Sequence, residues 1–270
     1  MDKNVITPYV EHKHLVTESY PDSRNLSDRQ RIYEYRTGPA FPDWLFDHID
    51  GPLGRVLDVG AGPGFWMRKA LERAELVAGM DLSPGMVGEA REASPHVAVA
   101  DAEHIPFRTD AFDTTLCFHM LYHVQNIPAA IGELRRVNRP DGRVMVTTNG
   151  NDHMAKLRES FDEIVRKMSG RSPEPILSEA RRFRLEDGEQ LLKEQFDQVE
   201  RHDLRSELTI PEQEPVVRYL QSIRGFHESK LPAGMSWDSL VEAFAQHVQS
   251  TIDKEGAFKI STHAGAFICQ

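Results

Sequence analysis

The sequence predicts an α/β fold with a doubly wound, mostly parallel sheet of seven strands. Short apolar runs alternate with helical patterns between residues 55 and 168, and this alternation is typical of parallel strands joined by helical crossovers. The first run leads into three glycines at alternate positions, Gly60, Gly62 and Gly64. Such a loop turns tightly and lets the backbone approach a ligand, which in this fold binds beyond the carboxyl ends of the strands.

Length and charge narrow the class of protein. The 270 residues carry a formal net charge of −10, and 40% of them are hydrophobic. These values are typical of a globular protein with a sizeable core, and the negative charge argues against a nucleic acid partner because it repels phosphates. The chain shows no apolar leader and no long apolar stretch. We therefore expect a cytoplasmic protein that does not enter a membrane, as a monomer or homodimer.

Residues 1–50 precede the first clear strand and predict an N-terminal helical extension. A capping sequence from Asn25 to Asp28 starts one helix, which runs through Tyr35. A second short helix is predicted from Phe41 to Ile49, before Gly51-Pro52 ends it.

The following segment, 51–209, is predicted to form the α/β core. The expected strands cover 55–59, 76–80, 96–100, 112–118 and 142–148. The expected helices cover 64–74, 84–93, 127–137 and 152–168, and a loop covers 101–111. A further helix near 186–195 and a strand at 197–208 complete this segment.

Residues 210–253 predict a helical cap inserted before the final strand, which lies within 254–270. The cap would contain helices at 212–223 and 237–252, and with residues 1–50 it would roof the ligand cleft. Its large apolar side chains either line a small-molecule pocket or pack the cap onto the core. These residues are Tyr219, Phe226, Trp237 and Phe244.

Asp81 ends the second predicted strand, where an acidic side chain can accept hydrogen bonds from both hydroxyls of a ribose. Together with the glycine loop, it indicates a cofactor that contains adenosine. A nicotinamide cofactor would require a third glycine where the chain has Phe65. The Gly-Lys-Ser/Thr of a phosphate-binding loop is also absent from this stretch.

Five ordered motifs across residues 55–150 resemble those of class I S-adenosylmethionine (SAM)-dependent methyltransferases, of the methyltransferase-domain type. The stretch Asp58–Gly64 resembles the first motif, and Asp81 matches the ribose-binding acid. The other three stretches are Asp101-Ala102 with 105–107, Phe112-Asp113 with 116–124, and 136–142. They resemble the adenine-edge motif, the fourth motif and the turn before the fifth strand.

The resemblance implies SAM as cofactor, S-adenosylhomocysteine (SAH) as product and no metal. In this family Asp81 would hold the ribose, Asp101 would accept from the adenine amino group, and the Ala102 N–H would bind the ring. Leu82 and Met86 would sandwich the adenine, unless Met86 only packs its helix. The cofactor-binding residues implied are Asp58, Gly60, Ala61, Gly62, Asp81, Leu82, Met86, Asp101, Ala102 and Phe118.

The sequence defines the binding site of the methyl acceptor less fully than that of the cofactor. Methyl transfer to an activated sulfonium needs positioning above all, and a base only when the acceptor carries a proton. The resemblance places His119 beside the methyl group, as base, acceptor-orienting group or pocket wall. His123 either packs under the same loop or contacts the acceptor, Asn149 contacts acceptor or cofactor, and Tyr20 closes over the methionyl end with Arg31 and Tyr35.

These observations predict a SAM-dependent methyltransferase that methylates an O or N atom of a small molecule, such as an intermediate of natural-product biosynthesis. An RNA or protein methyltransferase is the first alternative, and it would require a basic face. The second alternative is a module that binds SAM without catalysis.

Overall fold

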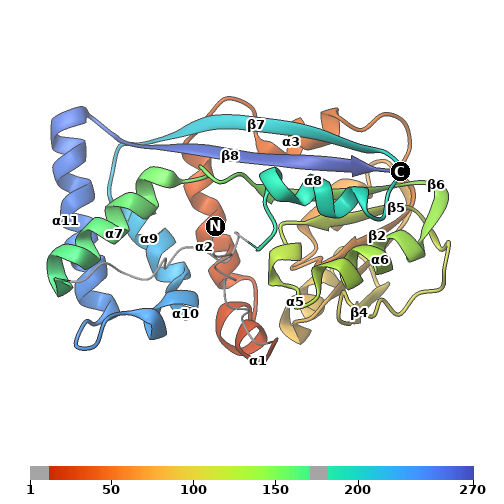
Figure 1. The fold of residues 1–270 in the computed structure, drawn as a ribbon, viewed down its shortest axis with the longest axis horizontal. Helices are drawn as coiled ribbons and strands as arrows, with labels where there is room; N and C mark the ends of the chain where they lie inside the picture. Colours follow the sequence, from red (N-terminus) through yellow and green to blue (C-terminus); the bar gives the residue numbers. More distant parts are fainter. Residues whose placement is uncertain (1–11, 171–181) are drawn as a thin grey trace, which may run out of the picture.

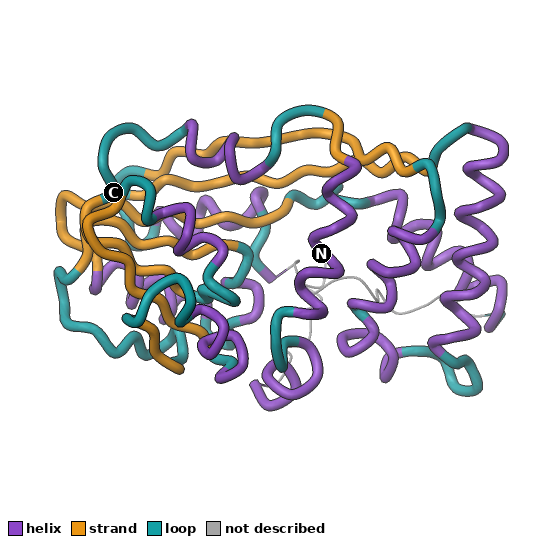
Figure 2. Tube along the Cα trace, turned by 180° about the vertical axis from the view of Figure 1, so that it is seen from behind, coloured by secondary structure: helices purple, strands orange, loops and turns teal. Residues whose placement is uncertain are grey.

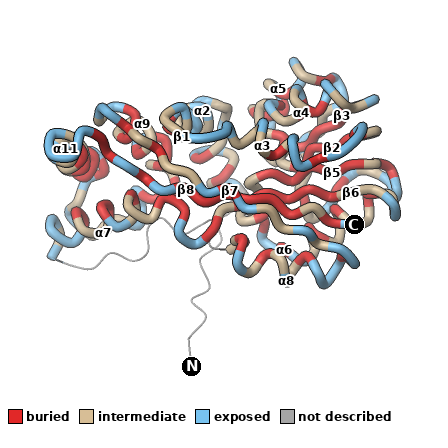
Figure 3. Tube along the Cα trace, turned by 90° about the horizontal axis from the view of Figure 1, so that it is seen from above, coloured by how far each residue is buried: buried red, intermediate tan, exposed pale blue. Residues whose placement is uncertain are grey.

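A computed structural model describes residues 12–170 and 182–270. It contains one sheet in the order β1-β7-β8-β6-β5-β2-β3-β4, with helices against both of its faces (Figures 1 and 3). The α/β fold is confirmed, but the sheet has eight strands and not seven. The extra strand, β1 (Arg36–Thr37), pairs with Leu208 and Glu207. Two residues are too few to show a strand period in a sequence.

The other strands follow the prediction closely. They are β2 (Gly54–Val59), β3 (Ala74–Asp81), β4 (Val97–Val99), β5 (Phe112–Phe118), β6 (Asn138–Asn149), β7 (Val199–Ile210) and β8 (Phe258–Cys269). Strands β2 to β6 are parallel to one another, whereas β8 is antiparallel to both β6 and β7. The strand order reverses between β2 and β5, so their carboxyl ends form the ligand crevice expected of this fold.

The helices form two groups. Those that cover the sheet are α3 (Phe41–Asp47), α4 (Phe65–Ala70), α5 (Pro84–Ala90), α6 (Ile127–Val137) and α8 (Leu185–Lys193). We call the second group the lid; it contains α7 (Ala155–Ser169), α9 (Glu214–Ser222), α10 (Arg224–His227) and α11 (Trp237–Glu255). Between the groups lie α1 (His12–His14), a π-turn at Leu15–Ser19, α2 (Arg24–Arg31) and a 3-10 turn at Ile32–Tyr35. Further 3-10 turns cover Leu121–His123 and Glu228–Lys230.

A long hairpin of β7 and β8 connects the sheet to the lid (Figure 2). Its pairing is continuous from Val199 opposite Cys269 to Ile210 opposite Phe258. Only the stretch of β8 from Ala264 to Cys269 also pairs with β6. The remainder extends past the parallel strands and carries the lid helices beyond the sheet.

The lid has its own apolar core. Trp237 and Phe244 are fully buried there, against Phe161 of α7 and Phe258 of β8. Helix α7, which lies in the segment that the sequence assigns to the α/β core, therefore packs within the lid. No helix among the described residues has the length and apolarity needed to cross a membrane.

The buried position of Phe244 yields a stability prediction. Phe244→Ala removes a fully buried ring and should lower the free energy of unfolding by about 3–5 kcal/mol, as core truncations of this size do. Met168→Ala, at the exposed end of α7, is the control, and its effect should stay within about 0.5 kcal/mol. Urea unfolding followed by circular dichroism measures both, and equal effects would contradict this packing.

Candidate active site

A cavity of about 670 Å³ lies between the carboxyl ends of the parallel strands, the N-terminal helices and the lid. Thirteen of the fourteen site residues predicted from the sequence line it. They are Tyr20, Gly60, Ala61, Gly62, Asp81, Leu82, Met86, Asp101, Ala102, Phe118, His119, His123 and Asn149. The remaining one, Asp58, is buried in β2 just before the glycine loop.

The glycine loop has left-handed backbone at Gly60, Gly62 and Gly64, with φ of 75°, 53° and 82°. The N–H groups of Gly60 and Ala61 donate to Met80 O, which ties the loop to β3. A Cβ at Gly60 would lie 2.8 Å from Met120 Cγ. Glycine is therefore required at this position by both conformation and space.

Asp81 holds the loop from the end of β3. Its Oδ2 accepts from Gly62 N at 2.9 Å, and its Oδ1 accepts from Ser83 N at 2.8 Å. Burial raises the pKa of Asp81, while these backbone hydrogen bonds act in the opposite direction. Each carboxylate oxygen can accept a second hydrogen bond, so the group can bind two ligand hydroxyls that reach it from the cavity.

Asp58 is a fully buried acid, and neither of its carboxylate oxygens has a hydrogen-bond partner in the described part of the chain. Burial raises its pKa from 3.8 to about 8, and the nearby charge of Asp81 adds to the shift. A buried carboxyl group without a partner destabilises the folded state unless it is protonated or faces a cation. A ligand ammonium group close to the glycine loop would supply that cation.

His119 follows β5 in a conformation that few side chains adopt, with φ of 52°. Its N–H donates to Thr147 O, and its half-buried ring packs 5.4 Å from the ring of Phe41. Burial lowers the pKa of His119 to about 4, and Arg36 contributes to the shift. The imidazole is therefore neutral at pH 7 and has a lone pair to accept a proton or hydrogen bond.

Two tyrosine–histidine pairs join the N-terminal segment to the strand ends. Tyr20 Oη lies 3.1 Å from His123 Nε2, and Tyr33 Oη lies 3.0 Å from His153 Nε2. Burial lowers the pKa of both histidines to about 3, so both rings are neutral at pH 7. His123 was expected either under the loop or at the acceptor; its ring packs on Tyr20 and lines the cavity, and its contact with an acceptor stays a prediction.

The remaining expectations for the lid and N-terminal segment divide in two. Tyr219 and Phe226 line the cavity, whereas Trp237 and Phe244 pack the lid interior. Of the three N-terminal residues expected at the methionyl end, Tyr20 lines the cavity. Tyr35 donates to Glu212 and Arg31 pairs with Asp28, so neither closes over the site.

Sequence reasoning missed many cavity residues that only the fold brings together, among them three from the N-terminal segment and one from the loop after β6. Tyr33, Arg29 and Arg36 come from the N-terminal segment, and His153 precedes α7. The amphipathic pattern of α2 distinguishes two faces of this helix, but it does not indicate what the less polar face contacts.

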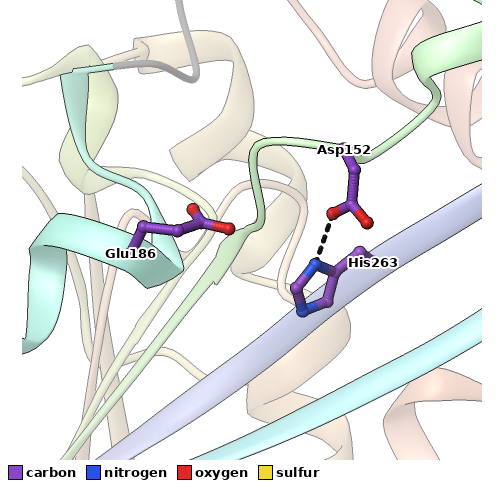
Figure 4. Close-up of side chains that lie close together, drawn as sticks. All are labelled: Asp152, Glu186 and His263. Atoms are coloured by element: carbon purple, nitrogen blue, oxygen red, sulfur yellow. Dashed lines mark hydrogen bonds and ion pairs between the residues drawn. The ribbon is translucent and has the colours of Figure 1, made fainter.

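Three residues near this edge have metal-ligating side chains, Asp152, Glu186 and His263 (Figure 4). Their ligand atoms lie within 4.8 Å of one another. Each ring nitrogen of His263 already faces a carboxylate, Asp152 at 2.5 Å and Asp203 at 3.0 Å. Although burial alone would raise the pKa of Asp152, hydrogen bonds from Arg205 and His263 lower it to about 2. Asp152 also pairs with Arg205, so these contacts brace β8 and leave a metal no free ring nitrogen.

Comparison with known proteins identifies the domain. Residues 57–146, which contain the glycine loop, β3 and β5, match the family described as methyltransferase domain. The fold agrees: a putative methyltransferase from Bacillus halodurans superposes with a TM-score of 0.58 at 15% identity, over 85% of this chain and 98% of that one. The family match covers about a third of the chain, and the likeness to the Bacillus protein concerns the fold.

Individual relatives match parts of the chain. A malonyl-[acyl-carrier protein] O-methyltransferase from Serratia marcescens is 31% identical over 42% of this chain and 45% of its own length. An uncharacterized methyltransferase from Mycobacterium tuberculosis is 29% identical over 67% of this chain and 70% of its own length. The alignments with the first relatives, including the one from Serratia, span about half of their lengths or less.

A solved structure superposes on nearly the whole chain, including the lid. Phosphoethanolamine N-methyltransferase 2 of Haemonchus contortus, in complex with S-adenosylhomocysteine, superposes with a TM-score of 0.57 at 22% identity. The superposition covers 96% of this chain and 60% of that one. At this identity the likeness concerns the fold.

The unpaired acid Asp58 leads to a prediction for the ligand-free protein. Above pH 6.5 the folded state keeps a proton on Asp58 that the unfolded state releases, because the pKa is about 8 when folded and 3.8 when unfolded. Asp58 should therefore contribute a negative slope to the free energy of unfolding between pH 6.5 and 8, of up to about 1.4 kcal/mol per pH unit. The buried histidines contribute a slope of opposite sign near pH 6.5, because they are neutral when folded and partly protonated when unfolded. The slope that Asp58 contributes is therefore the difference between the wild type and a variant that lacks this acid.

Asp58→Asn should remove this slope, since an amide stays neutral in both states. Asp110→Asn, at an exposed loop position, is the control and should keep it. Urea unfolding at several pH values measures the slope of each protein. Parallel curves for the wild type and Asp58→Asn would show that Asp58 does not carry the proton.

Proposed function

We propose that the protein is a methyltransferase that binds SAM in the cavity and transfers its methyl group to an O or N atom of a small molecule held under the lid. One observation carries the proposal. Asp81 locks the glycine loop through Gly62 N at the strand-order switch and still has acceptor capacity for a ribose diol.

The residues around that loop fit the other parts of SAM. The unpaired, buried Asp58 supplies a negative charge for the methionyl ammonium. Leu82, Met86 and Phe118 give an apolar wall for the adenine, next to the polar edge of Asp101 and Ala102. SAM has no phosphate, so the lack of a lysine in the glycine loop is consistent with it.

The chemical step is an in-line displacement. A lone pair of the acceptor forms the new bond to the methyl carbon, the carbon–sulfur bond breaks, and SAH leaves with the electron pair. When the acceptor is a hydroxyl or an ammonium, its proton must also depart. We assign this proton to His119, which is neutral at pH 7 and faces the cavity at the end of β5.

A small acceptor is supported by the cavity, which lies between the sheet and the lid. The net charge of −10 disfavours the alternative of an RNA acceptor, because RNA-binding proteins attract phosphates with positive charge. An experiment distinguishes a methyltransferase from a module that binds SAM without catalysis. Methyl transfer from labelled SAM into a metabolite extract is expected, and a protein that binds SAM but gives no labelled product would support the non-catalytic alternative.

The cofactor site yields a direct prediction. Asp81→Asn should weaken SAM binding at least about tenfold, because it replaces a charged acceptor of ribose hydroxyls whose hydrogen bonds are worth about 1.5–3 kcal/mol. Glu75→Gln, an exposed acid on the same strand, is the matched control and should bind as the wild type does. Isothermal titration calorimetry with SAM decides the question; equal affinity of Asp81→Asn and wild type would refute this role.

The proposed role of His119 calls for a substitution that keeps the backbone. Asparagine tolerates the positive φ of this position better than alanine does, so His119→Asn removes the base with little strain. Turnover of a hydroxyl or ammonium acceptor should fall about 100-fold or more, as for loss of a general base. SAM affinity should stay within about threefold of the wild type, because the base does not hold the cofactor. Unchanged turnover would rule out His119 as the base.

A further inference from the structure

We propose that the acceptor carries a carboxylate and that Arg29 binds it at the lid side of the cavity. The inference rests on the proposed function, because it describes the molecule to be methylated. Arg29 projects from α2 into the cavity lining, and its guanidinium carbon lies 4.7 Å from the ring centre of Tyr20 and 5.2 Å from that of Phe226. Two aromatic rings thus hold the guanidinium in place.

Arg29 lacks the partners that a buried guanidinium normally has. Its Nε and Nη2 are buried, and neither has a hydrogen-bond partner within residues 12–170 and 182–270. Leaving such donors unpaired costs about 1–3 kcal/mol each, and more for a charged group. The free protein bears this cost at the wall of an open cavity, where an incoming acceptor group would remove it.

A second unpaired group lies on the same side. His227, in α10 next to Phe226, also lines the cavity and is only 5% exposed. Its Nδ1 has no partner among the residues that the structure describes. Burial lowers its pKa to about 3, and the charges of Lys230 and Arg29 contribute, so the ring is neutral. Arg29 and His227 therefore both have unpaired polar atoms in the part of the lining that contains the aromatic ring of Phe226.

The groups around Arg29 leave its positive charge without compensation. Tyr20 and His123 are hydrogen-bonded to each other, and burial keeps His123 neutral and raises the pKa of Tyr219. The carboxylates found in the described cavity lining, Asp81 and Asp101, belong to the cofactor side of the site. A guanidinium among neutral groups favours a planar anion, and a carboxylate matches its two parallel N–H groups.

Arg29 and the proposed base His119 contact different parts of the cavity wall. It packs against Phe226 of the lid, whereas His119 lies at the end of β5 and packs against Phe41. We therefore assign the carboxylate to anchoring and the methylated O or N to another atom of the acceptor. Apolar lid residues such as Ile223 and Phe226 would contact the body of the molecule between them.

The test compares acids with neutral amides of the same shape. Calorimetry on the full chain saturated with SAH would titrate a series of carboxylates from benzoate to phenylbutyrate, and their primary amides. At least one acid should bind the wild type about tenfold or more tightly than its amide, the value of one charged hydrogen-bonding contact. In Arg29→Gln the acid and the amide should bind within about twofold of each other, because the charge is lost.

Two further variants control this experiment. Arg31→Gln lies on the same helix, but Arg31 is exposed and pairs with Asp28, so the preference for the acid should remain. Arg29→Lys keeps the charge and loses the planar fork, so its preference should lie between those of the wild type and Arg29→Gln. This variant also serves if Arg29→Gln does not fold.

Three results would overturn the proposal: no acid binds, acids and amides bind the wild type equally, or the preference survives in Arg29→Gln. A fourth is a loss of SAH affinity beyond about tenfold in Arg29→Gln, which would assign Arg29 to the cofactor. If the wild type itself does not bind SAH, the proposed function fails. The comparison of acids and amides on the ligand-free protein would still report on Arg29.

Discussion

The continuous pairing of β7 with β8 is the constraint on which the active site depends. Over its first half the hairpin is part of the sheet, since Ala264–Cys269 also pair with β6. Over its second half it leaves the parallel strands and buries Phe258 and Ile260 among the lid helices. The same two strands thus belong to both apolar cores. The cavity is the space that this geometry leaves between the cores, with α2 beneath the hairpin.

Burial determines the charges in this cavity as much as residue type does. His119, His123 and His153 have pKa values lowered to between about 3 and 4, so the histidines do not add positive charge at pH 7. Asp58, by contrast, has a raised pKa and no hydrogen-bond partner in the described structure. The ligand-free site therefore holds groups whose charges become stable only when a ligand with opposite charge arrives.

The part of the fold that rests on local patterns was predictable. Strands β2 to β5 and the glycine loop follow from apolar runs and turn residues that are adjacent in the chain, and most of the predicted site residues line one cavity because parallel strands end at one edge. Strand β1 was not predictable, because its two residues become a strand only through pairing with β7, 170 positions away. Sequence periodicity contains no information on such a partner.

The lid is a second example of what sequence periodicity cannot predict. The apolar stripe of α7 correctly predicts a helix with one buried face, but a stripe does not state which surface covers it. Helix α7 packs on α11 and on β8 within the lid core, and not on the parallel strands. Tyr33–His153 and Tyr20–His123 join residues more than 100 positions apart, so neither pair has a local signal.

Because of these long-range contacts, the proposed cofactor and acceptor sites are formed by different parts of the structure. The cofactor contacts implied by the resemblance come from the ends of β2, β3, β4 and β5, which are neighbouring strands of the core. The proposed acceptor side is formed by α2, the lid and the loop after β5, which meet because the hairpin holds the lid over the sheet. A change in α2 or α10 can therefore alter the acceptor without altering the glycine loop, Asp58 or Asp81. By this argument the methyl donor can be inferred from a short motif, whereas the acceptor must be inferred from unpaired groups such as Arg29 in the assembled cavity.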